Sequence, residues 1–460
     1  MLEDILPVIM YSFLGVLIVG NELVRRRAMP YDALFFFNIS YFVYFVVAPI
    51  HVLIGGVAFT RYHYVSDNYG LGDGHNALWI VICYISVCFG YSITPRMKKK
   101  ISTDKIHNRT WWVIILFLLS VATFSTVVYS LSVGGVVTAF KQAIYIRMGA
   151  FHVYSPFLFL KHFIPLFSSV LILSVALLLR DKSSKKKVPV YYYFVIPLFL
   201  WLFLYSAIVM GGRRVILIPL MMILFVYSNY KKKWSFKYVS GFVVFFCFVA
   251  VFWNAISFGI RDANFSQYLS GRYSSLRSVY ASLCRPLADP YMGWVGISNM
   301  EVAWLGFADL ITAPLQLLPG QLIAKTNDIS LLNYTTVCLK GLDRTYTAEA
   351  PPGFIGYFYL NCGYIGIVFG GIVFGMLGKV LHNLFLPRLR DPVGLVIYTW
   401  MVFSWAYFLR HGMFEFILTE RFHWWFACIT IVSILSFRIA LRRFHTHSLC
   451  TDTKISHDSL

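Results

Sequence analysis

Long apolar stretches alternate with short polar connections along almost the whole chain. A membrane core about 30 Å thick needs about 20 apolar residues in helical form. Such stretches lie at about 5–21, 32–56, 77–94, 111–133, 157–179, 191–210, 215–230, 238–259, 353–378, 394–410 and 424–441. The pattern predicts an all-α polytopic membrane protein with about 11 transmembrane helices and one membrane domain over residues 1–460. The apolar stretch Val302–Pro319 contains Pro314 and Pro319, which argue against a simple span. If it crosses with a partner segment, the count becomes 12 or 13.

Basic residues mark every second connection. The clusters are Arg25–Arg27, Arg96 with Lys98–Lys100, Lys185–Lys187, Lys231–Lys233, Arg388 with Arg390, and Arg442–Arg443. Cytoplasmic loops of inner-membrane proteins are enriched in Lys and Arg. The pattern therefore predicts an outward N-terminus, a cytoplasmic C-terminus, and outward loops at about 57–76, 134–156, 211–214, 260–352 and 411–423.

Composition supports this class and argues against others. Hydrophobic residues make up 58% of the chain, charged residues 13%, and the mean hydropathy is +0.68. The net charge of +20 lies almost entirely in the predicted cytoplasmic segments, as orientation requires, and not on one folded face as in a nucleic-acid-binding protein. Ile5–Gly20 follows Glu3 and Asp4 rather than a basic region, so we expect a first span and not a cleavable signal peptide. Gly378-Lys379 lacks the rest of a P-loop motif.

The outward loop 260–352, between helices eight and nine, is too long for a simple connection. Its cations are mostly arginines, at positions Arg261, Arg272, Arg277, Arg285 and Arg344, and its seven cations are balanced by seven acids. Arginine has a rigid fork that matches phosphate oxygens in pairs. The group indicates phosphate recognition, although each arginine could instead pair with one of the loop's acids. Cys284 and Cys338 lie in the same loop, and a disulfide between them is left open.

Two further motifs carry candidate chemistry. Gly211-Gly212-Arg213-Arg214 forms a short outer turn, where charge next to the membrane is usually functional; snorkelling of both arginines to lipid phosphate is the alternative. In the run from Arg344 to Gly363, Glu349 is a candidate base for a sugar hydroxyl, or else the partner of Arg344 in a salt bridge. Tyr357 and Asn361 are four residues apart and share a helix face.

Other features are weaker. Arg147 lies in the amphipathic stretch Phe140–Met148. His411 and Glu415 stand four apart in a cluster with Arg410, Arg421 and His423, which is poor evidence for a metal site. Asp67 and Asp73 form no DxD motif, which argues against a metal-dependent glycosyltransferase. The glycines of helix nine are spaced for close helix packing; packing within the chain is the favoured interpretation, and dimerisation is the alternative.

The chain resembles the bacterial O-antigen repeat-unit polymerases (the Wzy family) and, more distantly, the O-antigen ligases. The resemblance rests on the many-helix layout, the Gly-Gly-Arg-Arg turn, the arginine-containing late outward loop and the segment Pro351-Pro-Gly-Phe-Ile-Gly-Tyr-Phe-Tyr-Leu-Asn-Cys-Gly-Tyr-Ile-Gly366. Arg285 and Gly296 have the Arg-x10-Gly spacing found in some members, but loop 134–156 lacks a second copy.

The resemblance implies a glycosyltransferase of the bacterial inner membrane with its active side in the periplasm. The growing glycan on undecaprenyl pyrophosphate would be the donor, and a new undecaprenyl-pyrophosphate-linked repeat unit the acceptor. Fixed arginines could stabilise the pyrophosphate leaving group without a metal or other cofactor. The hypothesis assigns the pyrophosphate to Arg213, Arg214, Arg285, Arg277 and Arg147, catalysis to Glu349 and Arg344, and a sugar-binding or structural role to Tyr357 and Asn361. Expected partners are the lipid bilayer and a chain-length regulator protein, with no nucleic acid.

Two alternatives stay open. A ligase would transfer finished polysaccharide to lipid A core, and sequence separates it poorly from a polymerase. A flippase or transporter should show internal repeats and charges at mid-membrane, whereas the predicted spans are nearly free of charge and no repeat is apparent.

Overall fold

The computed structural model describes residues 2–25, 32–56, 60–95, 108–147, 156–183, 189–210, 213–231, 276–300, 305–312, 331–341, 350–386, 391–414, 418 and 421–437. Every regular element within these ranges is helical. Eight helices are long and apolar enough to cross a membrane, and Val215–Ser228 and Phe422–Phe437 are shorter apolar helices. The prediction of an all-α polytopic membrane protein is confirmed. The predicted span 238–259 lies outside the described residues.

The membrane-length helices follow the predicted ranges closely. They are α1 (Leu2–Val24), the continuous run α2–η1–α3 (Ala33–Phe42, Val43–Val47 and Ala48–Gly55), α5 (Gly74–Ile93), α6 (Asn108–Ser132), α8 (Leu166–Ser183), α9 (Tyr192–Val209), α16 (Gly353–Phe385) and α17 (Pro392–His411). The shorter apolar helix Val215–Ser228 is part of α10 (Arg213–Lys231). The 3-10 helix η3 (Pro156–Phe163) precedes α8. The element η1 is a single π-helical stretch inside a span.

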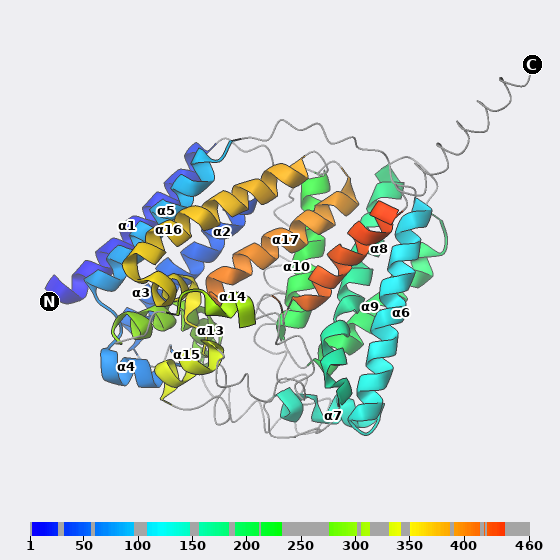
Figure 1. Cartoon of the computed structure of the whole chain (residues 1–460), viewed down its shortest axis with the longest axis horizontal. Coiled ribbons are helices and arrows are strands. Elements are labelled where there is room, and N and C mark those ends of the chain that lie inside the picture. Colours follow the sequence, from blue (N-terminus) through cyan, green and yellow to red (C-terminus); the bar gives the residue numbers. More distant parts are fainter. Residues whose placement is uncertain are drawn as a thin grey trace, which may run out of the picture.

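The predicted outward loops contain helices of their own. These are α4 (His63–Tyr69), α7 (Val136–Arg147), α13 (Leu276–Ser298), α14 (Ala308–Thr312) and α15 (Leu331–Lys340). The elements α4, α7 and α15 lie toward the lower edge of Figure 1. Because the sequence predicts that these loops face outward, we call this the outer end, and the opposite end the inner end.

The helices form two groups that share α17 (Figure 1). One group contains α1, α2, α5, α13 and α16, and the other contains α6, α8, α9, α10 and the helix Phe422–Phe437. The shared helix packs against α2 and α16 on one side and against α8 and α10 on the other. Its buried residues divide accordingly, with Trp405 and Phe408 in the first core and Val396 and Trp400 in the second.

Polar contacts join the predicted cytoplasmic ends of helices that are distant in sequence. Asn383 donates to the Pro95 carbonyl at 2.9 Å, and Asn108 donates to the Asp181 carboxylate at 2.6 Å. Arg180, at the end of α8, forms a salt bridge of 3.6 Å to Asp391 before α17. These contacts bring the end of α5 to the end of α16, and the end of α8 to the starts of α6 and α17.

The main departure from the sequence prediction is the shape of α16. The helix predicted over 353–378 is present, but its backbone is non-helical at Cys362 and at Gly363, where φ is +62°. Glycine is the residue that enters this region without strain. A Cβ atom on Gly370 would lie 2.2 Å from the Phe358 ring, although twelve residues of straight helix would separate them by about 18 Å.

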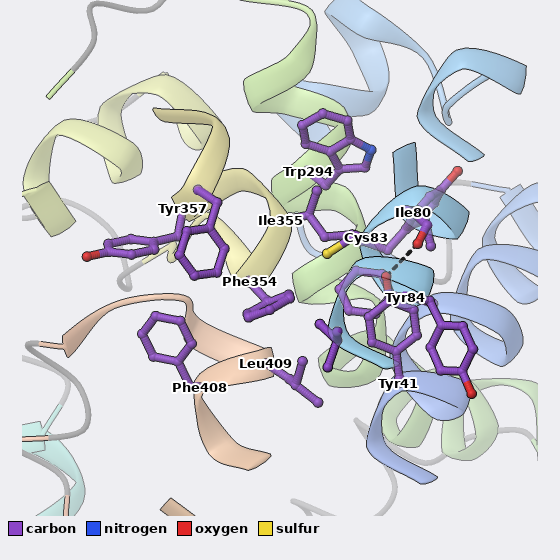
Figure 2. Packing of buried hydrophobic residues seen from close by; sticks show 14 of the residues in the cluster. Tyr41, Ile80, Cys83, Tyr84, Trp294, Phe354, Ile355, Tyr357, Phe408 and Leu409 are labelled. Atoms are coloured by element: carbon purple, nitrogen blue, oxygen red, sulfur yellow. Dashed lines mark hydrogen bonds between the residues drawn. The ribbon is translucent and has the colours of Figure 1, made fainter. Parts of the chain in front are cut away.

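The break therefore reverses the chain direction. Gly353–Asn361 (the short arm) folds back along residues 364–385 (the long arm). Figure 2 shows Phe354 of the short arm near Phe408 and Leu409 of α17. The rings of Phe354 and Phe408 have centroids 6.0 Å apart. The first turns of the predicted span thus form an antiparallel helical hairpin with the long arm.

Glycines of the long arm allow this packing within the chain. A Cβ atom on Gly375 would lie 2.1 Å from the Val87 carbonyl oxygen of α5, and one on Gly378 would lie 2.4 Å from the Trp405 ring of α17. Gly371 faces Ser86 in the same way. The expectation of tight packing within the chain is confirmed for these glycines.

Candidate functional site

The helix α13 lies across the outer ends of the first helix group and is held there by three hydrogen bonds. Tyr291 donates to the Leu71 carbonyl at 2.7 Å. Trp294 and Ser298 both bond Asn76, at 3.1 Å to its carbonyl and 2.7 Å to its side-chain oxygen. Since Asn76 opens α5, these bonds fix α13 to the scaffold of membrane-length helices.

One buried carboxylate on α13 gathers two arginines from separate parts of the chain. Asp289 is 7% exposed. Arg61, just before α4, donates Nε to Oδ1 at 3.2 Å and Nη2 to Oδ2. Arg410, in the last turn of α17, approaches Oδ2 with Nη2 at 3.4 Å. We call this the Arg61–Asp289–Arg410 cluster, and in it two guanidinium groups share one carboxylate.

The two arginines differ in their exposure. The Arg61 side chain is 47% exposed and that of Arg410 is 17% exposed. The backbone on both sides of Arg61 is buried, because Thr60 and Tyr62 are almost fully enclosed, and the Tyr62 N–H donates to Thr60 Oγ1 at 3.0 Å. Arg61 therefore exposes its guanidinium at the surface of the protein from a fixed backbone.

The segment Pro351–Gly353 reaches this cluster through close backbone contacts. A Cβ atom on Gly353, where φ is +73°, would lie 2.7 Å from the carbonyl oxygen of Pro290, the residue after Asp289. A Cβ atom on Gly412, where φ is +68°, would lie 2.0 Å from the Gly353 carbonyl oxygen. The Tyr62 hydroxyl donates to the Pro351 carbonyl at 3.4 Å. Glycine is needed at both positions because a side chain has no space there.

The hairpin produces this proximity. Gly353 is the first residue of the short arm. It lies close to Phe374 of the long arm, because the ring of the next residue, Phe354, has its centroid 4.7 Å from that of Phe374. Phe374 is ten residues along the long arm from Tyr364, or about 15 Å in helical rise. The segment Pro351–Gly353 therefore lies away from the hairpin turn and next to the end of α17.

Tyr357 and Asn361, predicted to bind sugar or to support the structure, are both buried and bond the loop before α16. The Tyr357 hydroxyl donates to Asp309 Oδ1 of α14 at 2.8 Å. The Asn361 side-chain oxygen accepts the Phe307 N–H at 2.5 Å. These contacts hold α14 against the short arm. Burial raises the pKa of the Asp309 carboxyl, and the Tyr357 hydroxyl partly offsets this.

A further arginine, Arg421, follows the end of α17 in the chain. The Arg421 guanidinium sits over the Tyr407 ring at 4.1 Å and the Trp424 ring at 4.6 Å. The His411 ring also lies 4.6 Å from that of Tyr407. The helix α17 ends at His411, with Gly412 in the left-handed conformation. Glu415 lies outside the described residues.

The remaining predicted site residues fall at the outer end or outside the described residues. Arg285 is half-buried on α13, one helical turn before Asp289, and Arg277 lies near the start of that helix. Arg213 and Arg214 are the first residues of α10, and Arg147 is the last residue of α7. Glu349 and Arg344 lie outside the described residues. Cys284 and Cys338 are both free thiols.

Sequence reasoning missed the importance of Arg61 and Asp289. Asp289 counted only among the acids that balance the large loop, and Arg61 was not singled out. The available signal was an arginine in the first outward loop, where orientation does not require one. The spacing that drew attention to Gly296 has a packing explanation, because a Cβ atom there would lie 2.5 Å from Leu339. Asp73 caps α5 by accepting the Asn76 N–H at 2.9 Å.

Guanidinium groups held in this way are donors suited to oxyanions such as phosphate. Within the described ranges, no group of three or more His, Cys, Asp or Glu side chains is placed to hold a metal ion. Comparisons of this chain with protein-family models, with curated proteins and with solved structures found no match.

Proposed function

We propose that this protein polymerises lipid-linked polysaccharide repeat units at the periplasmic face of a bacterial inner membrane. It transfers the growing glycan from undecaprenyl pyrophosphate to the non-reducing end of a new undecaprenyl-pyrophosphate-linked repeat unit. The observation that carries the proposal is the convergence of Arg61 and Arg410 on Asp289, beside Pro351–Gly353. This brings two guanidinium groups together at the predicted outward end of a bundle of membrane-length helices.

The chemistry needs that charge. The acceptor hydroxyl attacks the anomeric carbon of the donor, and the bond from that carbon to the pyrophosphate oxygen breaks. The leaving undecaprenyl pyrophosphate takes the bonding electron pair, so negative charge grows on its phosphates. Donors that already point at that position stabilise the transition state without reorganising. Arginines in a partly buried cluster meet this requirement and stay charged at every relevant pH.

The proton of the acceptor hydroxyl passes to a base. Glu349 stays our candidate, because it stands two residues before Pro351 in the chain, and the Pro351 carbonyl accepts the Tyr62 hydroxyl next to Arg61. The neighbouring Ala350 is buried, and its N–H donates to Thr336 Oγ1 at 3.1 Å. Both lipid-linked substrates lie in the same leaflet, so holding them side by side supplies proximity.

The direct test uses purified protein and a synthetic undecaprenyl-pyrophosphate-linked repeat unit in the presence of EDTA. The wild type should form a ladder of glycan lengths. Arg61→Gln and Arg410→Gln should each slow ladder formation by about 10²-fold, the usual cost of losing one transition-state hydrogen-bond donor. Arg109→Gln is the matched control, since Arg109 is an exposed arginine at the inner start of α6. A requirement for a divalent ion would contradict the arginine mechanism.

A deletion strain separates the alternatives. Loss of a polymerase leaves lipid A core capped with single repeats, whereas loss of a ligase leaves the core bare. In the Arg213→Ala, Arg214→Ala double variant, stalled single repeats should accumulate on the outer leaflet. Accumulation on the inner leaflet would favour transport.

A further inference from the structure

Asp289 holds Arg61 by one edge of its guanidinium. The contact uses Nε and Nη2, which form a side-on pair with the two carboxylate oxygens. A guanidinium has five N–H donors. The Nη1 donors and the second Nη2 donor form a separate end-on edge, so Arg61 can bind a second oxyanion while it remains bound to Asp289.

The position of Asp289, and with it the side-on contact to Arg61, is fixed by the packing of α13. Asp289 is buried on α13, which Tyr291, Trp294 and Ser298 tie to the outer ends of the bundle. A flexible arginine loses several rotatable bonds when it binds a phosphate, and a pre-formed pair removes that cost.

We infer that Asp289 is a positioning residue for phosphate recognition: it orients the end-on edge of Arg61 toward the pyrophosphate of the lipid-linked donor. This inference rests on the proposed function for the identity of the ligand. It adds that an acid, which by charge alone would weaken anion binding, is required for Arg61 to contribute.

Charge and orientation oppose each other when Asp289 is replaced. Asp289→Asn removes a negative charge next to the anion site, which favours anion binding, and removes one side of the ion pair, which releases Arg61. The change in affinity of this variant alone therefore has no fixed sign. The coupling energy between Arg61 and Asp289 does have a fixed sign. In a double-mutant cycle, the charge at position 289 is the same in both proteins of each Arg61 comparison, so its contribution cancels.

The experiment measures inorganic pyrophosphate binding by the full-length protein in lipid nanodiscs. In the wild-type background, Arg61→Gln should weaken binding by at least about tenfold, the loss of a charge-assisted bidentate contact. In the Asp289→Asn background, the same change should weaken binding by less than about twofold, because Arg61 is no longer oriented. Asp289→Glu keeps the charge and lengthens the side chain, so it should give an intermediate Arg61 effect.

The outcomes distinguish this inference from the proposed function. If Arg61→Gln costs the same in both backgrounds, Asp289 has only a structural role and the inference is overturned while the proposed function stands. If the wild type does not bind pyrophosphate at millimolar concentration, the anion site itself is refuted and the inference fails with it. If binding and coupling are as expected but no ladder forms, the reaction is wrong and the positioning role survives.

Folding is checked for each variant by size-exclusion chromatography and thermal unfolding. If Asp289→Asn does not fold, the effect of Arg61→Gln on pyrophosphate affinity is measured in the Asp289→Glu background instead. An effect as large there as in the wild type would overturn the inference. Arg109→Gln should leave pyrophosphate affinity unchanged.

Discussion

Phe354 and Phe374 are twenty positions apart within α16, yet their ring centroids lie 4.7 Å apart. In a straight α-helix the two residues would be about 30 Å apart along the axis. Their contact follows from the reversal at Cys362 and Gly363, and it brings Pro351–Gly353 beside Asp289 and the end of α17. The hairpin is therefore the feature that assembles the candidate site.

A disulfide between positions 358 and 370 tests the hairpin. Phe358→Cys and Gly370→Cys, placed in a variant lacking the eight native cysteines, should cross-link on mild oxidation. A Cβ atom on Gly370 would lie 2.2 Å from the Phe358 ring, so the two positions are close in space. A disulfide needs Cβ atoms about 4 Å apart. Maleimide labelling should find no reactive thiol. The pair Gly370→Cys with His382→Cys, twelve apart within the long arm, should stay unlinked. Equal labelling of both pairs would refute the hairpin.

The contact between the long arm and α5 predicts a sharp difference between two glycines. Gly375→Ala should lower the free energy of unfolding by about 1–3 kcal/mol, the usual cost of overpacking, because the new methyl group would lie 2.1 Å from the Val87 carbonyl oxygen. Gly20→Ala in α1 is the control: nothing lies within 4 Å, and helix propensity favours alanine by up to about 1 kcal/mol. Thermal unfolding in detergent measures both. A tolerated Gly375→Ala would show that the two helices are not packed so closely.

Asn361 separates a structural role from sugar binding. Asn361→Ala removes the acceptor of the Phe307 N–H, and the lost hydrogen bond should cost about 1–2 kcal/mol of stability. Phe307 has a φ of +61°, unusual for a residue other than glycine, so its turn depends on such support. Asn68→Ala is the control: Asn68 is exposed on α4 and donates to the Tyr64 carbonyl of its own helix, so its loss should lower the melting temperature by much less. If Asn361→Ala kept full stability and lost only glycan transfer, sugar binding would be the better explanation.

Asp309 predicts a pH dependence of stability. Burial raises the pKa of this carboxyl in the folded state above its ordinary value of 3.8. The folded protein then binds the proton more tightly than the unfolded chain, so stability falls as the pH rises from about 3.8 through the raised folded value. Asp309→Asn cannot ionise and keeps an oxygen for the Tyr357 hydroxyl.

We therefore expect Asp309→Asn to gain stability relative to the wild type between pH 4 and pH 7, measured by thermal unfolding across that range. Asp67→Asn, at an exposed carboxyl on α4, is the matched control and should follow the wild type. A difference between Asp309→Asn and the wild type that stays constant with pH would contradict the assignment.

The sequence by itself determined the fold class and the order of the membrane-length helices. Apolar length sets a span, and the basic clusters alternate with it, so the ranges of α5, α6 and α9 could be predicted within a few residues. It also singled out the Pro-Pro-Gly segment, Asn361 and the arginines of the large outward loop.

The tertiary structure alone decided which of these residues meet. Hydropathy cannot show that α16 turns back at Gly363, because both arms are apolar and the reversal depends on one backbone conformation. Nor can it show that Arg61 and Arg410 share Asp289, since the three residues lie on segments far apart in the chain. Pairing of charges depends on distance in space, and periodicity along a helix carries no information about contacts between segments hundreds of residues apart.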